Sequence, residues 1–292
     1  MSAFTLGYNE ACYKDVPDLR ADIIEADRAG FDFIELRFDC VMGYLGSGGK
    51  LSEIGALFRK LNVKPATQNA LYLYPRCLEK DDCGERRDAL EHDLALLDKL
   101  HDEAGVESAI VVAPLLNSPA QTSGYERAFV RDDCARALDA LLARLPWCSF
   151  AFEPVGLGRS LVRSLDGALE IVRQVSSPRC TLVLDSCNLF LERLESRFDF
   201  SEVKPSEIGA VHLMNGVNPG CAPSDQSFRR LCGDGDWVDT GLFVGELLKT
   251  GYRGMVSAEV FHQGYEQELT RREIIARAFN SLKAEIARAS HE

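Results

Sequence analysis

Apolar and polar positions follow two alternating patterns along this chain. Short apolar runs of strand-like composition recur at residues 3–8, 31–38, 63–71, 107–115, 148–155, 180–185, 208–214 and 254–261. Between them, apolar residues recur at helical spacing, as in residues 16–30, 85–105 and 125–145. Eight strand–helix units in 292 residues, about 36 residues each, predict an α/β fold, a single (β/α)₈ TIM barrel over residues 1–292. That fold typically takes about 250 residues.

The alternative to a closed barrel is an open, doubly wound parallel sheet. Such a sheet often carries a GxGxxG phosphate-binding loop after its first strand, and no such motif follows residues 3–8. The closed barrel is therefore the prediction, and the open sheet is the second choice.

Side chains alternate between the two faces of a strand. In each of the last four predicted strands, one face carries mostly small residues and the other carries bulky ones. The face with small residues ends in polar ones, and it carries Ser149, Ala151 and Glu153, then Thr181, Val183 and Asp185, then Ala210 and His212, then Ser257 and Glu259. The opposite face carries bulky residues such as Phe150, Leu182 and Val211, as expected where strands pack against outer helices. We therefore expect the small face to point into the barrel.

This assignment brings Glu153, Asp185, His212 and Glu259 to the carboxyl ends of four neighbouring strands. A single acid at a strand end more often caps a loop or pairs with a base, and a single inward histidine is more often hydrogen-bonded in the core. Three carboxylates that meet at matching depth beside an imidazole, however, would repel one another unless a cation lay among them. The set predicts one divalent metal ion, either Mn²⁺, Zn²⁺, Co²⁺ or Mg²⁺.

Composition and charge limit the classes of molecule that the protein is expected to bind. The formal net charge is −12, from 33 Lys plus Arg and 45 Asp plus Glu, which opposes binding to nucleic acid or anionic lipid. The sequence shows no secretory signal pattern and no apolar stretch long enough to span a membrane, so we expect a cytoplasmic protein. Its ten cysteines form no CxxC pair and are expected to be buried free thiols. A small molecule is the expected partner, and a homodimer is left open.

The chain also resembles a known family through several short segments. These are YNEA (8–11), GFDFIELR (30–37), KPATQNAL (64–71), FEPVG (152–156), LVLDS (182–186), VHL (211–213), GDGDWVD (233–239) and VSAEVF (256–261). They resemble the sugar isomerases and epimerases of the xylose isomerase-like TIM barrels, most closely the inosose (2-keto-myo-inositol) isomerases. The resemblance implies that Glu153, Asp185, His212 and Glu259 hold one divalent ion, and that the two glutamates exchange protons with the substrate.

Two positions depart from the family pattern. Asn188 stands where the family usually has histidine three residues after the metal-binding aspartate, and Met214 and Asn215 stand where an acid is usual. Asparagine can form hydrogen bonds but does not titrate near neutrality. Asn188 is therefore expected either to bind substrate or merely to cap the following helix.

Other polar residues are candidates for substrate binding. Asn9 and Asn69 end the first and third predicted strands, and Glu35 and Arg37 share one face of the second. The alternative for the latter two is an ion pair with each other inside the barrel. In the long segment after the seventh strand, Arg229 or Arg230 could reach the substrate or stay in solvent, and Trp237 could form an apolar wall.

The predicted site suits chemistry on keto sugars or keto-inositols. A metal bound by a carbonyl and a neighbouring hydroxyl acidifies the carbon between them and stabilises an enediolate, with Glu153 and Glu259 as base and acid. A dehydratase acting on inosose is the main alternative. A Schiff-base aldolase needs a lysine at a strand end, which is absent, and a multi-zinc endonuclease needs more well-placed histidines. A protein that only binds its ligand, without catalysis, would not need Glu153 and Glu259 to exchange protons with it.

Overall fold

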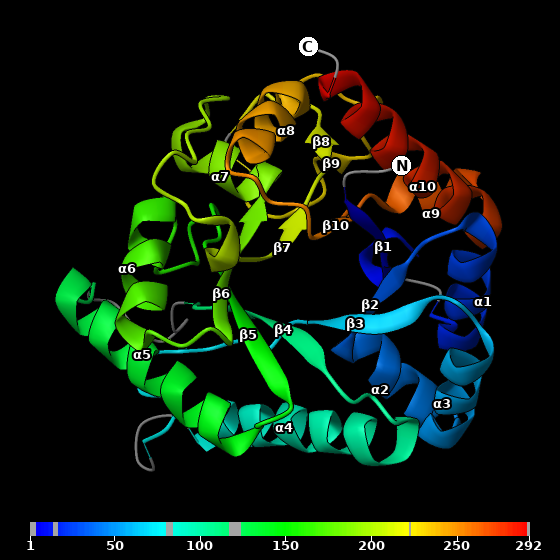
Figure 1. The fold of residues 1–292 in the computed structure, drawn as a ribbon, viewed down its shortest axis with the longest axis horizontal. Helices are drawn as coiled ribbons and strands as arrows, with labels where there is room; N and C mark the ends of the chain where they lie inside the picture. Colours follow the sequence, from blue (N-terminus) through cyan, green and yellow to red (C-terminus); the bar gives the residue numbers. More distant parts are fainter. Residues whose placement is uncertain (1–3, 14–16, 80–83, 117–123, 222, 291–292) are drawn as a thin grey trace.

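Eight parallel strands close into a barrel at the centre of the molecule (Figure 1). The computed structural model describes residues 4–13, 17–79, 84–116, 124–221 and 223–290. Around the barrel the strand order is β1-β10-β7-β6-β5-β4-β3-β2. The strands are β1 Thr5–Asn9, β2 Phe33–Arg37, β3 Lys64–Asn69, β4 Ala109–Pro114, β5 Cys148–Glu153, β6 Cys180–Asp185, β7 Ile208–His212 and β10 Met255–Ala258. The predicted closed barrel is confirmed, and the open sheet is wrong.

Helices form a ring around this barrel (Figure 1). They are α1 Leu19–Ala29, α2 Phe38–Gly46, α3 Leu51–Lys60, α4 Gly84–Ala104, α5 Arg127–Arg144, α6 Leu165–Val175, α7 Ser186–Arg193, α8 Thr240–Lys249, α9 Gln263–Glu268 and α10 Arg271–Ala289, with the 3₁₀ turns η1 Glu10–Tyr13 and η2 Pro205–Glu207. Local sequence sets their ends: Asp18 caps α1 by accepting a hydrogen bond from the amide of Ala21, and Gly30 ends it at a φ of 97°.

Two separate apolar cores confirm which strand face points inward. A small cluster inside the barrel consists of Ala70, Val112, Ala151, Val183 and Ala210. The bulky residues of the opposite face, including Phe150, Leu182 and Val211, belong to the large core between the barrel and the helices. Small and branched side chains therefore fill the barrel interior and leave the polar residues at the strand ends to form the site.

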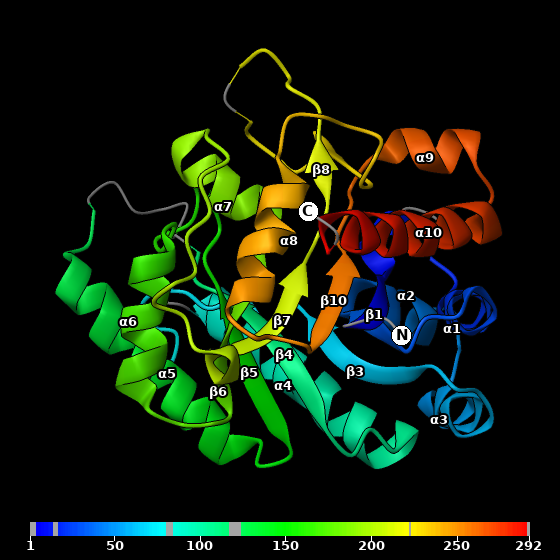
Figure 2. The same ribbon diagram turned by 45° about the horizontal axis from the view of Figure 1, so that its top comes forward.

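A long segment after β7 extends beyond the carboxyl ends of the barrel strands (Figure 2). It contains a two-residue antiparallel pairing, β8 Asn215–Gly216 with β9 Arg229–Arg230, which the sequence pattern did not predict. Because this pairing fixes the orientation of Arg229, it bears directly on the site described below.

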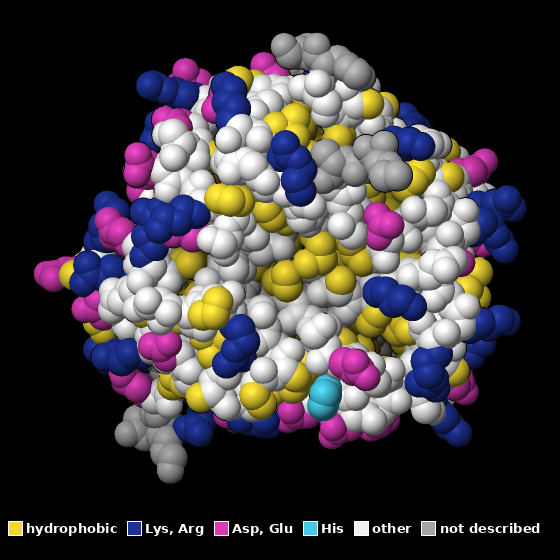
Figure 3. Space-filling model, viewed as in Figure 1, with side chains coloured by type: hydrophobic (Ala, Val, Ile, Leu, Met, Phe, Trp, Pro, Cys, Tyr) yellow, Lys and Arg dark blue, Asp and Glu magenta, His cyan; other side chains and the backbone are white. Residues whose placement is uncertain are grey.

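The described surface carries charges of both signs (Figure 3), and the described cysteines form no disulfide. In Figure 3, acidic and basic side chains are interspersed around the rim of the coloured surface, and apolar ones gather near its centre. The cysteines within the described residues are free thiols, and all but one are buried, as predicted. Cys221 is exposed, contrary to the prediction, and Cys83 lies outside the described residues.

Among the described residues, no helix is long and apolar enough to cross a membrane.

Candidate metal centre and pocket

Four side chains converge at the carboxyl end of the barrel. Glu153, Asp185 and His212 are the last residues of β5, β6 and β7, and Glu259 directly follows β10. One ligand atom from each lies within 4.8 Å of those of the other three. Asp185 and His212 are fully buried, while the two glutamates keep slight exposure. Three buried carboxylates around one imidazole form a donor set that suits a divalent cation.

His212 presents one ring nitrogen to this centre. Its Nε2 lies 3.0 and 3.2 Å from the two carboxylate oxygens of Glu35. Its Nδ1 lies 3.6 Å from Asp185 and 3.7 Å from both Glu153 and Glu259, and it has no hydrogen-bond partner among the described residues. A histidine that binds a metal needs a ring nitrogen that is not used in a hydrogen bond. Nδ1 of His212 is buried, faces three carboxylates and forms no hydrogen bond among the described residues, so the four residues fit a divalent ion.

Glu35 is held on both oxygens. Asn69 Nδ2 donates to its Oε1 at 2.7 Å, and Ser257 Oγ donates to its Oε2 at 2.9 Å. Burial alone would raise the pKa of Glu35, but the charge and hydrogen bond of His212 and the bonds from Asn69 and Ser257 lower it. An ionised Glu35 favours the tautomer with the proton on Nε2, which leaves the Nδ1 lone pair for a cation.

The neighbouring carboxylates also act on the protonation of His212. Although burial opposes the charged form, Glu35 and Glu259 raise the pKa of His212 well above its usual value. A divalent ion among the same carboxylates would displace the proton from Nδ1.

Asp185 has two roles that follow from its position at a strand–helix junction. Its Oδ1 caps α7 by accepting a hydrogen bond from the amide of Asn188 at 2.6 Å. Its Oδ2 lies 3.0 Å from Arg229 Nη1. Burial would raise the pKa of Asp185, but the charge of Arg229 lowers it. The capping residue of α7 is therefore Asp185, and the interpretation of Asn188 as a helix cap is wrong.

Arg229 is the cationic partner that the sequence did not single out. Its side chain is fully buried, and Nη1 donates to Glu259 Oε2 at 2.7 Å while lying 3.0 Å from Asp185. The following residue faces away: Arg230 donates to the carbonyl oxygens of Ser227 and Arg229. Since β9 is extended, consecutive side chains point to opposite sides. Pairing of β8 with β9 thus decides which arginine reaches the ligands, and no periodicity in the sequence marks that pairing.

A cavity of about 510 Å³ opens above the candidate metal centre. Glu153 and Glu259 line it, whereas Asp185 and His212 lie beneath its floor. Its walls come from the strand ends Arg37 and Asn69, from Asp39 of α2, and from loops that contribute Tyr72, Leu116, Val155, Arg159, Gln226 and Phe261. A volume in the range of about 300–1,000 Å³ is typical of small-molecule sites.

The residues predicted to bind substrate separate into two groups. Arg37 and Asn69 line the cavity; the Arg37 guanidinium packs 5.2 Å from the Phe261 ring centroid, and its Nε donates to Asp39 at 3.2 Å. Asn9, Glu35 and Asn188 are fully buried and are not among the lining residues.

The remaining predictions are corrected by the described geometry. Glu35 bonds to His212 rather than forming an ion pair with Arg37. Arg230 and Trp237 are not among the lining residues, because Arg230 bonds to loop carbonyls and Trp237 packs on Phe190 and Phe228. The sequence analysis missed Tyr72, Gln226 and Phe261 as wall residues, since they lie in loops without a repeating pattern.

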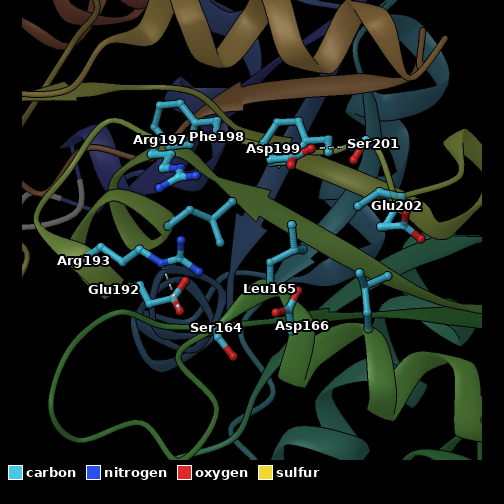
Figure 4. Close-up of a pocket in the computed structure, with 14 residues that line it drawn as sticks. Ser164, Leu165, Asp166, Glu192, Arg193, Arg197, Phe198, Asp199, Ser201 and Glu202 are labelled. Carbon is cyan, nitrogen blue, oxygen red and sulfur yellow. Dashed lines mark hydrogen bonds and ion pairs between the residues drawn. The ribbon is translucent and has the colours of Figure 1, made fainter.

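A second cavity of about 220 Å³ lies between α6, α7 and residues 197–203 (Figure 4). Its walls mix both signs of charge: Arg193 lies 3.8 Å from Glu192, and Asp199 accepts a hydrogen bond from the amide of Ser201. Its lining contains neither histidine nor cysteine.

Comparison with known proteins matches this architecture. The family model of the xylose isomerase-like TIM barrels matches residues 23–285. The chain belongs to this family. It is 24% identical over 292 residues to the inosose isomerase of Bacillus velezensis, covering 97% of each chain. It is 25% identical over 251 residues to the 3-dehydroshikimate dehydratase of Pseudomonas putida, covering 83% of this chain and 36% of that protein.

A solved structure shows the same fold. The crystal structure of the IolI protein with a zinc atom superposes with a TM-score of 0.83 at 23% identity, covering 98% of this chain and 99% of that one. The resemblance noted in the sequence is confirmed for the family and for the fold.

Proposed function

We propose that this protein is a divalent-metal-dependent isomerase or epimerase of a keto sugar or keto-inositol. The observation that carries the proposal is the buried set Glu153, Asp185, His212 and Glu259, of which the two glutamates line a polar cavity. The inosose isomerase relative and the zinc atom in the IolI crystal structure support it. A zinc ion in that structure also makes zinc a candidate here beside Mn²⁺, Co²⁺ and Mg²⁺.

Each group at the floor and walls has a chemical task in this proposal. When bound, the ion would supply Lewis-acid stabilisation for the negative charge that develops as a ketone becomes an enediolate. Glu153 and Glu259 face the cavity and are placed to exchange protons with substrate carbon. Arg37 and Asn69 are placed to bind hydroxyl groups, and Phe261 offers an apolar face to the ring.

A dehydratase is the second candidate, supported by a specific observation. The 3-dehydroshikimate dehydratase of Pseudomonas putida matches 83% of this chain. Water loss next to a ketone also begins by removing a proton from the carbon beside the carbonyl, so the same carboxylates could serve it.

The test incubates metal-loaded protein with a panel of inososes, ketohexoses, 3-keto sugars and 3-dehydroshikimate. NMR and mass spectrometry follow the products, and Asp185→Ala serves as the control that lacks a metal ligand. A product of unchanged mass supports isomerisation or epimerisation, and loss of one water supports the dehydratase. If the wild-type protein binds the ion but converts no ketone of the panel, the proposed function is overturned.

A further inference from the structure

Most charged side chains that line the cavity above the candidate metal centre have a partner. Arg37 Nε donates to Asp39 at 3.2 Å, and its Nη1 lies 3.5 Å from Glu259 Oε1. Glu153 and Glu259 belong to the candidate metal centre. Asp225 accepts a hydrogen bond from a backbone amide of its own loop at 2.8 Å. The positive charge of Arg37 is therefore shared between two carboxylates before any ligand enters.

Arg159 also lines this cavity, and its charge has no such partner. It is an exposed residue, and its guanidinium forms no ion pair with any residue that the structure describes. The hydrogen bonds from Ser227 chiefly, and the charge of Arg159 to a lesser extent, lower the pKa of Asp225. Arg159 is thus close enough to Asp225 to act on its charge, but it is not bonded to it. Its donors remain available to a ligand in the cavity.

The backbone that carries Arg159 is held firmly by the residue that follows it. Ser160 is buried, and its amide donates to the carbonyl oxygen of Leu157 at 3.0 Å. Its hydroxyl lies 3.1 Å from the carbonyl oxygen of Leu115 and 2.9 Å from that of Val162. These contacts fix the turn against the segment that follows β4. Because the backbone is already ordered, a ligand would have to order only the arginine side chain, which lowers the entropic cost of binding.

Tyr72 adds a hydroxyl donor beside Arg159. The amides of Leu71 and Leu73 donate to carbonyl oxygens of β4 at 2.9 Å, so this segment is extended and its side chains alternate. The two leucines are buried, whereas Tyr72 lines the cavity and is 38% exposed. Burial raises the pKa of Tyr72, and the charges of Arg37 and Arg159 oppose this rise. The tyrosine therefore keeps its proton and lies close to both guanidinium groups.

We propose that Arg159 and Tyr72 bind an anionic group of the substrate, so that the ketone of this site carries a carboxylate or a phosphate. This inference rests on the proposed function, in which the ion binds the ketone end, and adds a charge at another position of the same molecule. A guanidinium can bind either anion through two parallel hydrogen bonds, and the tyrosine hydroxyl adds a third donor. An uncharged sugar would cover Arg159 without supplying a counter-charge, which costs free energy.

The experiment measures the binding of three ring compounds to the metal-loaded protein by isothermal titration calorimetry. Quinate carries a carboxylate, myo-inositol 1-phosphate carries a phosphate, and myo-inositol is uncharged. Hydrogen bonds to charged groups typically change affinity by about 10- to 100-fold, so at least one anion should bind more tightly than myo-inositol by such a factor. The tighter anion identifies the group as carboxylate or phosphate. If neither anion binds more tightly than myo-inositol, the inference is overturned.

Matched variants show whether the anion binds Arg159 or the ion itself. In Arg159→Gln the preference for the anion should disappear, while the affinity for myo-inositol stays the same. Arg159→Lys keeps the charge but not the paired donors and should retain part of the preference. Arg272→Gln removes the same charge from an exposed residue that does not line the cavity, and it should retain all of the preference. A preference that persists in Arg159→Gln, or that Arg272→Gln also removes, overturns the inference.

Turnover separates this inference from the proposed function. The titrations require no reaction, so they decide the charge of the ligand even if no ketone of the panel is converted, which would mark failure of the proposed function. For an anionic ketone that the protein converts, Arg159→Gln should raise KM by the factor lost in binding and leave kcat near the wild-type value. Arg159 lies on the exposed wall and is not one of the four candidate ligands. A lower kcat at unchanged KM would overturn its role in binding the anion.

Discussion

The candidate metal centre consists of two halves at different depths. Asp185 and His212 are fully buried beneath the cavity floor, and their remaining contacts are to a helix amide, to Arg229 and to Glu35. Glu153 and Glu259 stand above them and line the cavity. The difference suggests that the deep pair binds the ion, whereas the upper pair also meets the substrate. Each half can be changed separately, so the two roles can be distinguished.

Breaking the deep half should have the largest effect. His212→Ala or Asp185→Ala is expected to reduce the metal content from about one ion per chain to none, because each removes a ligand from a set of four. Most of the fold should remain, since the barrel core is apolar and separate from the ion. Elemental analysis and circular dichroism of the purified variants measure both. Full metal content in either variant would remove that residue from the site.

Changing the upper half should abolish turnover more than binding of substrate. Loss of a positioned acid or base typically costs about 10² to 10⁴ in rate. Glu153→Gln and Glu259→Gln should lose more than this, because each also removes a charged metal ligand. Steady-state kinetics at saturating metal give the change in kcat. Near-normal turnover in either variant would exclude that glutamate from the chemistry.

Removing the charge that supports His212 should lower the metal affinity by an intermediate amount. Glu35→Gln keeps the size of the side chain but removes the charge that holds the His212 tautomer. Loss of such a supporting carboxylate typically lowers metal affinity by about 10- to 100-fold. Titration with a chelator-buffered metal measures it. Ser257→Ala, which removes one bond to the same carboxylate, is the control and should cost less. Equal affinity in Glu35→Gln and wild type would contradict the role of Glu35.

The pH dependence of stability should differ between the metal-free and metal-loaded protein. Burial foremost, with Glu259 and Asp185 adding, raises the pKa of Glu153 to about 7, although His212 opposes this. A folded-state pKa above the unfolded value of about 4.3 means that the native state holds more protons, so stability falls as pH rises between these values. The raised pKa of His212 acts in the same direction at higher pH, above its unfolded value of about 6.5.

Thermal melts across this pH range provide the measurement. The metal-free protein should melt at lower temperature as pH rises. The metal-loaded protein should show a weaker decline, because the ion takes the place of these protons and binds more tightly as they leave. Identical pH profiles with and without the ion would contradict this account of the centre.

The sequence predicted the convergence of the four candidate ligands better than the contacts that support them, for a physical reason. Glu153, Asp185, His212 and Glu259 lie at or just after strand ends, where alternation fixes which way a side chain points. Glu35 reaches His212 across the barrel interior from β2 to β7, two strands that are not neighbours in the sheet. No local pattern encodes such a contact, even though Glu35 itself was predicted to point inward.

Loop residues were still harder to predict. Arg229 reaches the ligands because the β8–β9 pairing turns it inward, and its orientation depends on two residues of antiparallel contact inside a long loop. The orientation of Asn188 depends on the close approach of Gly156 from another loop. These contacts exist only once the barrel has brought the loops together, so periodicity in the sequence carries no sign of them.

The most direct test of the account is the fate of hydrogen in D₂O. The central claim is that a carboxylate of the upper half moves a proton, and such a proton can exchange with solvent. When wild-type, metal-loaded protein converts a ketone in D₂O, the product should gain deuterium at the carbon that accepts the proton, and recovered substrate should slowly gain it beside the carbonyl. Product formed at the full rate without any solvent deuterium would contradict the claim and indicate a hydride shift between the carbons.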